Sequence, residues 1–182
     1  MTARRTRTSV GPSDDDASFS SYGNRWLAML QKPWGFAADK ALVRATGFSF
    51  FSWINARLGG RPYTPVLLLT TIGAKSGEPR TRVLPYIRFE DDYVVIGSNS
   101  GGPKDPAWAH NIRANSECWI QVGRRRSPAR GHVTLGDERA SVFDVVAVEK
   151  PNVPRYQERA STFGRDIPLV RLVPQDPALL RR

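Results

Sequence analysis

Cysteine and histidine are scarce in this sequence of 182 residues. The single cysteine, Cys118, excludes a disulfide bond within the chain. It lies in the strand-like run 118–122, so we expect an inert core residue. Only two histidines, His110 and His132, are present, so a metal site built from histidine and cysteine is not expected.

Long apolar runs are also missing. The longest apolar stretch, around residues 47–54, is far shorter than the ~20 residues that cross a bilayer. The basic residues Arg4, Arg5 and Arg7 are not followed by an apolar run, so no secretory signal is expected. The sequence therefore predicts a cytoplasmic protein.

Acidic residues are in the minority, with 17 Asp and Glu against 27 Lys and Arg, and the net charge is +10. Such a surface suits an anionic partner, which could be nucleic acid, an anionic membrane, or a phosphorylated or carboxylated small molecule. Charge alone does not choose among them. The arginine run 124–126 is typical of a solvated hairpin turn, and no aromatic stacking platform lies beside it, so nucleic acid is not expected.

Several glycine-based motifs are absent. A Walker A loop needs Lys and Ser or Thr directly after its second glycine, whereas Lys75 and Ser76 precede Gly77. Neither the dinucleotide motif Gly-x-Gly-x-x-Gly nor the hydrolase motif Gly-x-Ser-x-Gly occurs. Nucleotide-dependent phosphoryl transfer, Rossmann-type cofactor binding and serine hydrolysis are therefore unsupported.

The composition predicts one domain between two tails. Polar, serine-rich residues 1–25 predict a disordered N-terminal tail, residues 26–175 the domain, and residues 176–182 a short polar C-terminal tail. Apolar residues at helical spacing predict a helix over 36–58, or two short helices because Gly47 weakens the middle. Gly59 and Gly60 end this helical region.

Short strands are predicted over 66–71, 81–88, 93–98, 117–122, 127–135 and 167–173, with a turn at Asp91-Asp92. Short helices are predicted over 106–115, 136–150 and 156–163. For the helix 136–150 we expect Asp137 as the N-cap and a buried stripe of Ala140, Phe143 and Ala147. Many short strands with few helices predict a mainly β (α+β) fold, in which a small closed or half-closed β-barrel carries peripheral helices.

The turn 73–77 between the first two strands carries Lys75 and Ser76, and Arg80 follows it. A tight turn exposes backbone N–H groups, and two cations with a hydroxyl beside them form a pocket for a phosphate or a carboxylate. From spacing alone, a merely solvated hairpin turn is the favoured alternative.

Three phenylalanines and a tryptophan lie within residues 48–53. Ordinary core packing accounts for most of these rings. The surplus indicates a ligand pocket, a dimer contact, or, with arginines at both ends, a helix that rests on a membrane surface.

Two segments of the sequence resemble the deazaflavin-dependent nitroreductase family. They are LLLTTIGAKSGEPRTRVLP at 67–85 and VVIGSNSGGPKDPAWAHNIRANSECWIQVG at 94–123. The likeness extends to YQERASTFGRDIPLVRL at 156–172 and covers roughly residues 36–173. It implies an actinobacterial-type enzyme with a split β-barrel related to FMN-binding barrels, and an 8-hydroxy-5-deazaflavin, coenzyme F420, as its cofactor.

The resemblance also implies roles for individual residues in coenzyme binding. The phosphate end of the coenzyme is expected on Lys75, Ser76 and Arg80. The deazaflavin ring is expected against Ser98, Asn99, Gly101 and Gly102, where glycine lets backbone approach a flat ring. Trp108 and His110 would support this wall, His110 in a structural role. The sequence departs from the family pattern at Ala74, Asn99, Ala109 and Arg159.

By this resemblance the chain is an F420H2-dependent oxidoreductase of the nitroreductase or quinone reductase type. It would pass a hydride to a small apolar acceptor such as a quinone, an enone or a nitroaromatic. Tyr156 and Ser98 are the catalytic candidates, and packing at a helix edge is an equal alternative for Tyr156. The substrate candidates are Phe48, Phe51, Trp53 and Tyr156. A quinone acceptor would explain aromatic rings beside arginines, with the protein peripheral on the inner face of the membrane.

Three other functions stay open at this point. A non-catalytic deazaflavin carrier would bind the coenzyme without turnover. An FMN-binding split barrel would be yellow on purification, and a nucleic-acid-binding module would be retained on DNA in a salt-sensitive way. Flavin-type split barrels often form dimers, so a homodimer is a further expectation.

Overall fold

The computed structural model describes residues 32–180, without the side chains of residues 177 and 180. The predicted N-terminal tail, residues 1–25, lies outside the described residues. The chain divides into two compact units, Met1–Phe36 and Ala37–Arg182. In the first unit the described residues contain the start of helix α3 (Pro33–Thr46). All further elements belong to the second unit.

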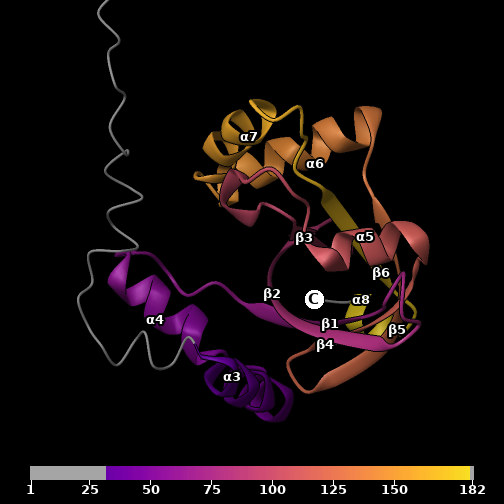
Figure 1. The fold of residues 1–182 in the computed structure, drawn as a ribbon. Helices are drawn as coiled ribbons and strands as arrows, with labels where there is room; N and C mark the ends of the chain where they lie inside the picture. The colour runs from indigo at the N-terminus through magenta and orange to yellow at the C-terminus, as the bar shows by residue number, and fades with distance from the viewer. Residues whose placement is uncertain (1–31, 181–182) are drawn as a thin grey trace, which may run out of the picture. The chain divides into compact units, whose positions relative to one another are not determined.

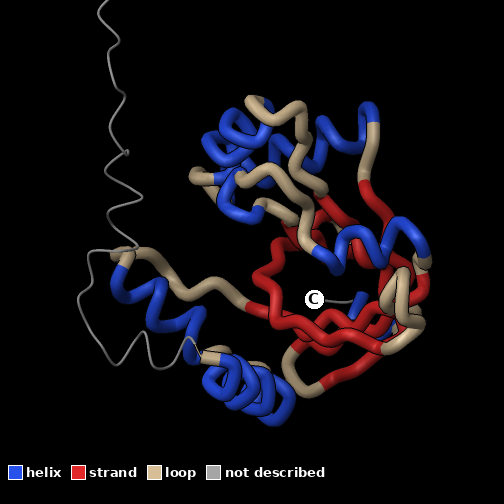
Figure 2. The backbone as a smooth tube through the Cα atoms, viewed as in Figure 1, coloured by secondary structure: helices blue, strands red, loops and turns tan. Residues whose placement is uncertain are grey.

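Six antiparallel strands of the second unit close into a barrel in the order β1-β2-β3-β6-β5-β4 (Figures 1 and 2). The strands are β1 (Val66–Ile72), β2 (Pro79–Phe89), β3 (Asp92–Ile96), β4 (Glu117–Val122), β5 (Arg125–Val133) and β6 (Leu169–Pro174). Their ends differ from the predicted ones by no more than two residues. The predicted fold class, a β-barrel with peripheral helices, is confirmed.

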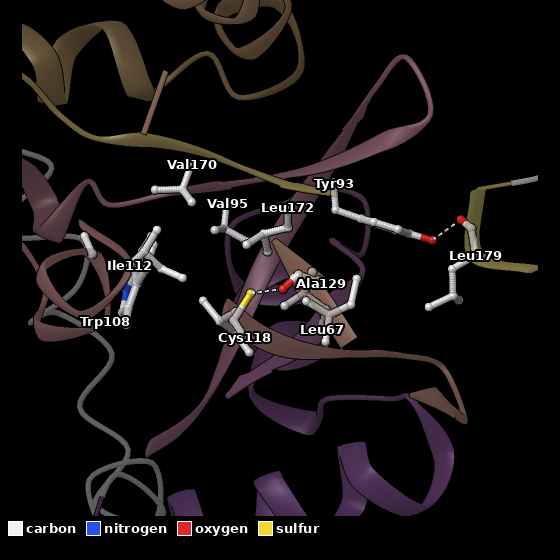
Figure 3. Close-up of a cluster of buried hydrophobic side chains, with 13 residues drawn as sticks. Leu67, Tyr93, Val95, Trp108, Ile112, Cys118, Ala129, Val170, Leu172 and Leu179 are labelled. Atoms are coloured by element: carbon white, nitrogen blue, oxygen red, sulfur yellow. Dashed lines mark hydrogen bonds between the residues drawn. The ribbon is translucent and has the colours of Figure 1, made fainter. Parts of the chain in front are cut away.

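The barrel interior is the main hydrophobic core (Figure 3). Alternate residues of a strand face opposite sides of a sheet. Leu67 and Leu69 of β1 therefore point inward and are fully buried, while Leu68 points outward and packs with Val43 of α3. Cys118 lies in the same interior cluster, as predicted, and its Sγ donates to the carbonyl oxygen of Ala129 at 3.4 Å. Burial raises the pKa of the Cys118 thiol to about 12, which makes it unreactive.

The predicted alternative of two helices divided near Gly47 is confirmed, with α3 followed by α4 (Phe50–Leu58). The chain breaks at Gly47, whose φ of +78° favours glycine. A Cβ at Gly47 would also lie 2.4 Å from Cα of Gly123, so the chain needs glycine here for two reasons. The buried carboxylate of Asp39 accepts hydrogen bonds from the backbone N–H of Phe50 and the hydroxyl of Ser49, and so caps α4.

The remaining helices are η1 (Asn99–Gly101, a 3₁₀ turn), α5 (Ala107–Ala114), α6 (Gly136–Glu149), α7 (Val153–Ser161) and α8 (Pro177–Leu180). Helix α5 contributes buried Trp108 and Ile112 to the barrel core. A second cluster fills the space between α6, α7 and the outer side of the barrel, and the two helices lie side by side (Figure 1).

Two details predicted for α6 were wrong. Leu135 occupies the N-cap position, and no side chain caps the helix there. The fully buried residues are Val142 and Val146. Of the predicted stripe, Ala140 is exposed, whereas Phe143 is partly buried against the second cluster. The contacts with the barrel, namely with Ile87 and its neighbours in the second cluster, decide which side of α6 is buried.

The β2–β3 turn and the C-terminal segment also differ from the prediction. The turn is Glu90-Asp91, with Glu90 at φ +53°, and Asp92 already pairs with Phe89 as the start of β3. The last described residues form α8 rather than a polar tail. Leu179 of α8 is buried in the barrel core, and its carbonyl oxygen accepts a hydrogen bond from the Tyr93 hydroxyl at 3.0 Å.

Candidate active site

The turn between β1 and β2 uses only some of its backbone N–H groups for hydrogen bonds within the turn. Gly73 N–H donates to the carbonyl of Glu78 at 2.9 Å, and Gly77 N–H donates to that of Gly73 at 2.8 Å. Ser76 Oγ accepts from Glu78 N–H at 3.3 Å. In the described part of the chain, the N–H groups of Lys75 and Ser76 have no hydrogen-bond partner, so these two donors are available to an anion.

The side chains predicted to bind a phosphate converge on this turn. A Cβ at Gly73 would lie 2.6 Å from Ser76 Oγ and 3.9 Å from Arg80 Cγ, so both side chains lie against the glycine. Lys75, Ser76 and Arg80 are all exposed. Two free N–H groups, a hydroxyl and two cations on one exposed turn suit a phosphate or a carboxylate, which is the chemistry that the anionic end of F420 requires.

Asn111 of α5 fixes this turn and was not predicted as a site residue. Its Oδ1 accepts a hydrogen bond from the N–H of Ala74 at 3.0 Å, and its Nδ2 donates to Thr71 Oγ1 at 2.9 Å. Both Asn111 and Thr71 are buried. A buried amide inside a helix is the sequence signal that could have revealed this role, because such a group needs polar partners.

The loop after β3 holds a strained conformation. Asn99, Ser100 and Gly101 have φ values of +45°, +51° and +71°. For Ser100 a left-handed conformation costs about 1–3 kcal/mol, whereas asparagine tolerates it at a lower cost. The Asn99 side chain donates to the carbonyl of Lys104 at 3.0 Å, so it closes the loop. Strain of this kind persists only where surrounding contacts enforce it, and it is common at binding sites.

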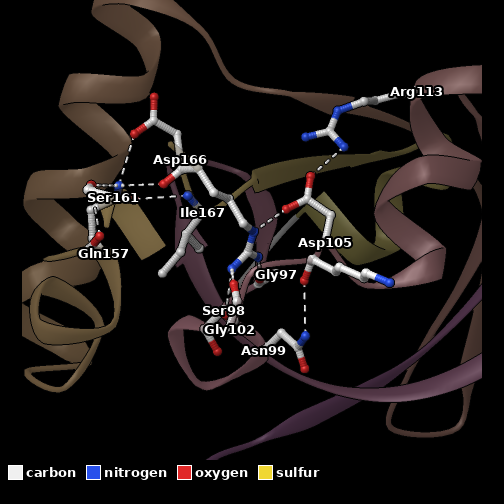
Figure 4. A network of polar contacts seen from close by, with 12 residues as sticks. Gly97, Ser98, Asn99, Gly102, Asp105, Arg113, Gln157, Ser161, Asp166 and Ile167 are labelled. Carbon is white, nitrogen blue, oxygen red and sulfur yellow. Dashed lines mark hydrogen bonds and ion pairs between the residues drawn. The ribbon is translucent and has the colours of Figure 1, made fainter. Parts of the chain in front are cut away.

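Arg165 supplies contacts that hold this loop. It is buried, and its guanidinium donates to the carbonyl oxygens of Gly97, Ser98 and Gly102. Its Nε also donates to the carboxylate of Asp105, which is labelled in Figure 4. Sequence patterns do not reveal the role of Arg165, because the groups that it binds lie 60 or more residues away in the chain.

Asp105 connects this network to α5. Its second oxygen accepts a hydrogen bond from Arg113 of α5 at 2.6 Å (Figure 4). Burial disfavours the charged form of Asp105, but the hydrogen bonds from Arg165 and Arg113 outweigh it and hold the pKa of the carboxyl below its usual value. Helix α5 thus binds the turn through Asn111, and it is linked to the loop through Arg113, Asp105 and Arg165.

Helix α7 lies directly against the loop. A Cβ at Gly101 would lie 2.7 Å from the carbonyl oxygen of Tyr156 and 3.0 Å from Cβ of Arg159. The structure therefore brings the predicted ring-binding loop, including half-buried Ser98, next to the helix of Tyr156. The Tyr156 side chain is also half-buried and packs against the second hydrophobic cluster. Trp108 lies deeper, in the barrel core.

The predicted substrate aromatics belong to another part of the second unit. The Phe48 ring stacks on Tyr63 with centroids 5.4 Å apart, and Trp53 lies 5.7 Å from Phe50. Phe48 and Trp53 are 38% and 40% exposed, whereas Phe51 is half-buried. None of these rings is a member of the cluster against which Tyr156 packs.

A cavity of about 420 Å³ opens on the outer face of β1, β2 and β4. Its lining includes Arg44, Thr70, Trp119 and Arg126. No residue predicted for the coenzyme or the acceptor lines this cavity, so it is separate from the candidate site.

Within residues 32–180, no group of three or more His, Cys, Asp or Glu side chains is arranged to hold a metal ion. None of the helices in that part of the chain combines the length and the apolar character needed to cross a bilayer.

Comparison with known proteins identifies similar sequences. A family model described as F420H(2)-dependent quinone reductase matches residues 48–174. The F420H(2)-dependent quinone reductase Rv1261c of Mycobacterium tuberculosis is 37% identical over 124 residues, which are 65% of this chain and 78% of the relative. A putative F420H(2)-dependent quinone reductase of the same organism, Rv3178, is 35% identical over 85 residues, or 47% of this chain and 71% of the relative.

Solved structures with the same barrel are also similar. An F420-H2 dependent reductase, FDR-A, has a TM-score of 0.53 and 30% identity, and the match covers 59% of this chain and 93% of that one. A chain described as a domain-swapped dimer has a TM-score of 0.53 and 26% identity, and the match covers 68% of this chain and 99% of that one. These likenesses confirm the split-barrel class.

Proposed function

Because the chain belongs to the F420H(2)-dependent quinone reductase family, we propose that it passes a hydride from reduced coenzyme F420 to a quinone. The protein is an F420-dependent oxidoreductase and F420 is its coenzyme. The quinone acceptor is the proposed part. Among quinones, enones and nitroaromatics, the family description and the names of the similar mycobacterial proteins favour the quinone.

The observation that carries the proposal is the pairing of the cationic turn with the strained loop through α5. Lys75, Ser76 and Arg80 would hold the phosphate end of the coenzyme, where free N–H groups and cations match its charge. Ser98, Asn99, Gly101 and Gly102 would lie against the ring. When bound, the reduced coenzyme supplies a hydride from ring carbon C5.

On the acceptor side, the chain must orient a carbonyl oxygen and provide a proton. Tyr156 is the candidate proton donor, since its helix contacts Gly101 of the loop 97–102, the proposed ring loop. Ser98 is the candidate second hydrogen-bond donor to the acceptor. Half-burial of both side chains restricts water near the reacting atoms and strengthens hydrogen bonds to the oxygen that gains charge.

The exposed rings near α4 support the choice of a membrane-soluble acceptor. Phe48, Trp53 and Tyr63 are each more than a third exposed, and Arg57 and Arg61 are exposed nearby in sequence. Rings with arginines beside them suit the headgroup region of an anionic bilayer. We therefore include a peripheral membrane contact in the proposal. Flotation with anionic liposomes tests this contact. The Trp53→Ser variant should no longer float with the lipid. Absence of the wild type from the lipid fraction counts against the contact.

The organisation of the chain is part of the same proposal. We take residues 26–175 as the catalytic domain, with the addition that α8 completes its core. The similar domain-swapped dimer supports a homodimer. Sedimentation of the purified chain as a monomer at all concentrations would rule that state out.

The decisive experiment is titration with oxidised F420, followed by quenching of tryptophan fluorescence, beside an FMN titration. Lys75→Ala and Arg80→Ala should each weaken F420 binding by about 10- to 100-fold, because each charge-assisted contact contributes about 1.5–3 kcal/mol. Arg126→Ala, which removes an exposed arginine of the separate cavity, should leave binding unchanged. Turnover of reduced F420 with a soluble naphthoquinone, a cyclic enone and a nitroaromatic then tests the acceptor. Tight binding without turnover would identify a carrier instead.

A further inference from the structure

We propose that Arg165 is a positioning residue, which holds the loop 97–102 in the only conformation that receives the ring of the coenzyme. The inference rests on the proposed role of this loop. The Arg165 side chain forms no hydrogen bond with the predicted phosphate turn, and at Ser98 it binds the backbone carbonyl rather than the hydroxyl. It acts through backbone groups of the loop.

The hydrogen bonds of the Arg165 guanidinium support this inference by their number and direction. The Arg165 Nη1 donates to the carbonyl oxygens of Ser98 at 3.1 Å and Gly102 at 2.8 Å, and Nη2 donates to that of Gly97. These three carbonyls bracket the left-handed residues. A planar guanidinium with donors in a fixed fork can satisfy them together, which a lysine ammonium cannot do with the same geometry.

The hydrogen bonds within the loop are not enough to stabilise its conformation. Its internal bonds are those from Gly101 N–H to the carbonyl of Ser98 and from Gly102 N–H to that of Asn99, each 2.9 Å. They enclose two consecutive non-glycine residues with positive φ, Asn99 and Ser100. Asparagine tolerates this conformation, but serine favours a right-handed or extended backbone. An outside partner must offset this preference, and Arg165 binds the loop on both sides of the strained residues.

The Arg165 backbone is itself fixed by α7. Gln157 of α7 donates through Nε2 to the carbonyl of Arg165 at 3.4 Å and to the carboxylate of Asp166 at 2.9 Å, and its Oε1 accepts from Ile167 N–H at 2.9 Å. Figure 4 shows Gln157, Asp166 and Ile167 on one side of the network and Gly97, Ser98 and Gly102 on the other. Arg165 therefore also fixes the ring loop against the helix of Tyr156.

A stabilising role without effect on the site is the competing explanation, and Arg171 provides the matched control. Arg171 lies six positions later, its side chain is 17% exposed, and it forms ion pairs with Asp92, Glu90 and Glu138. Its partners are on β3, the β2–β3 turn and α6. Removal of either arginine should lower the melting temperature, but only removal of Arg165 should alter the loop.

The experiment compares Arg165→Met, Arg165→Lys and Arg171→Met with the wild type. Hydrogen exchange of the Gly101 and Gly102 amides is measured first, without coenzyme, because their protection reports the two bonds inside the loop. We expect exchange at these amides at least tenfold faster in Arg165→Met and wild-type exchange in Arg171→Met. Titration with F420 should then give a Kd at least tenfold higher for Arg165→Met alone, with Arg165→Lys between it and the wild type.

The outcomes separate this inference from the proposed function. If the wild type binds no F420, the proposed function fails, while exchange at Gly101 and Gly102 still decides whether Arg165 holds the loop. Wild-type exchange in Arg165→Met, or equal changes in Arg165→Met and Arg171→Met, would overturn the inference. If Arg165→Met does not fold, Arg165→Lys is judged by the same two measurements against Arg171→Met.

Discussion

Replacing Asn111 with leucine should separate the stability of the protein from its affinity for the coenzyme. Leucine has the same number and branching of side-chain heavy atoms as asparagine, a larger volume, and no polar side-chain atoms. The change removes the bonds to Ala74 N–H and Thr71 Oγ1. The Thr71 side chain is fully buried, so its hydroxyl would lose a partner that water cannot replace.

The magnitude follows from these two bonds. A buried polar group left without a partner costs about 1–3 kcal/mol, and an ordinary hydrogen bond contributes about 1 kcal/mol. Together they lower the free energy of unfolding by about 2–4 kcal/mol. For a protein of this size, 1 kcal/mol corresponds to about 2–4 °C, so the melting temperature should fall by about 4–16 °C. F420 binding should weaken as well, because the turn of Lys75 and Ser76 loses its link to α5.

The double variant Thr71→Val with Asn111→Leu provides the control. Replacing both buried polar partners with apolar groups of similar shape is nearly neutral, so most of the melting temperature should return. The affinity for F420 should not return, because Ala74 N–H still has no partner. Thermal denaturation and the fluorescence titration measure the two quantities on the same samples. Recovery of both together would refute the positioning of the turn by Asn111, as would a single variant that melts within a degree of the wild type.

Three further predictions concern other parts of the second unit. Gly47→Ala should destabilise the protein by more than about 1 kcal/mol in urea denaturation, because it combines a positive φ with a Cβ only 2.4 Å from Gly123; an unchanged midpoint would contradict the close approach. The lowered folded-state pKa of Asp105 means that its stabilisation is present above its unfolded pKa of about 3.9 and is lost as pH falls through the folded value. Asp105→Asn should therefore unfold less steeply than the wild type below about pH 4 in acid titrations. Cys118, with a pKa of about 12, should resist alkylation at pH 8 until the protein is unfolded, and rapid labelling of the native protein would show that the thiol is accessible.

The strands could be predicted because their signals are local. Alternation of apolar residues and the glycines at the turns placed β1 and β4 to within one residue. The buried side of helix α6 could not be predicted from the sequence of the helix alone. Its sequence offers more than one apolar stripe at a spacing of 3.6, and the barrel selects Val142 and Val146 through contacts that the helix sequence does not contain.

The candidate site divides in the same way. The cationic turn was predictable from Gly73, Lys75, Ser76 and Gly77, which are neighbours in the chain. Asn111 and the arginine that holds the ring loop were not, since their partners lie 37 or more residues away and are mostly backbone groups. Backbone partners leave no pattern in the side chains, so no spacing rule points to them.

The attachment of α5 at two points has a consequence for the size of the ligands that the protein can accept. The helix is bonded to the turn through Asn111 and, by way of Arg113, Asp105 and Arg165, to the loop 97–102. If α5 shifts as a rigid body, the turn and the loop shift with it, and the distance between them is conserved. A molecule that bridges the turn and the loop is therefore expected to be selected by its length.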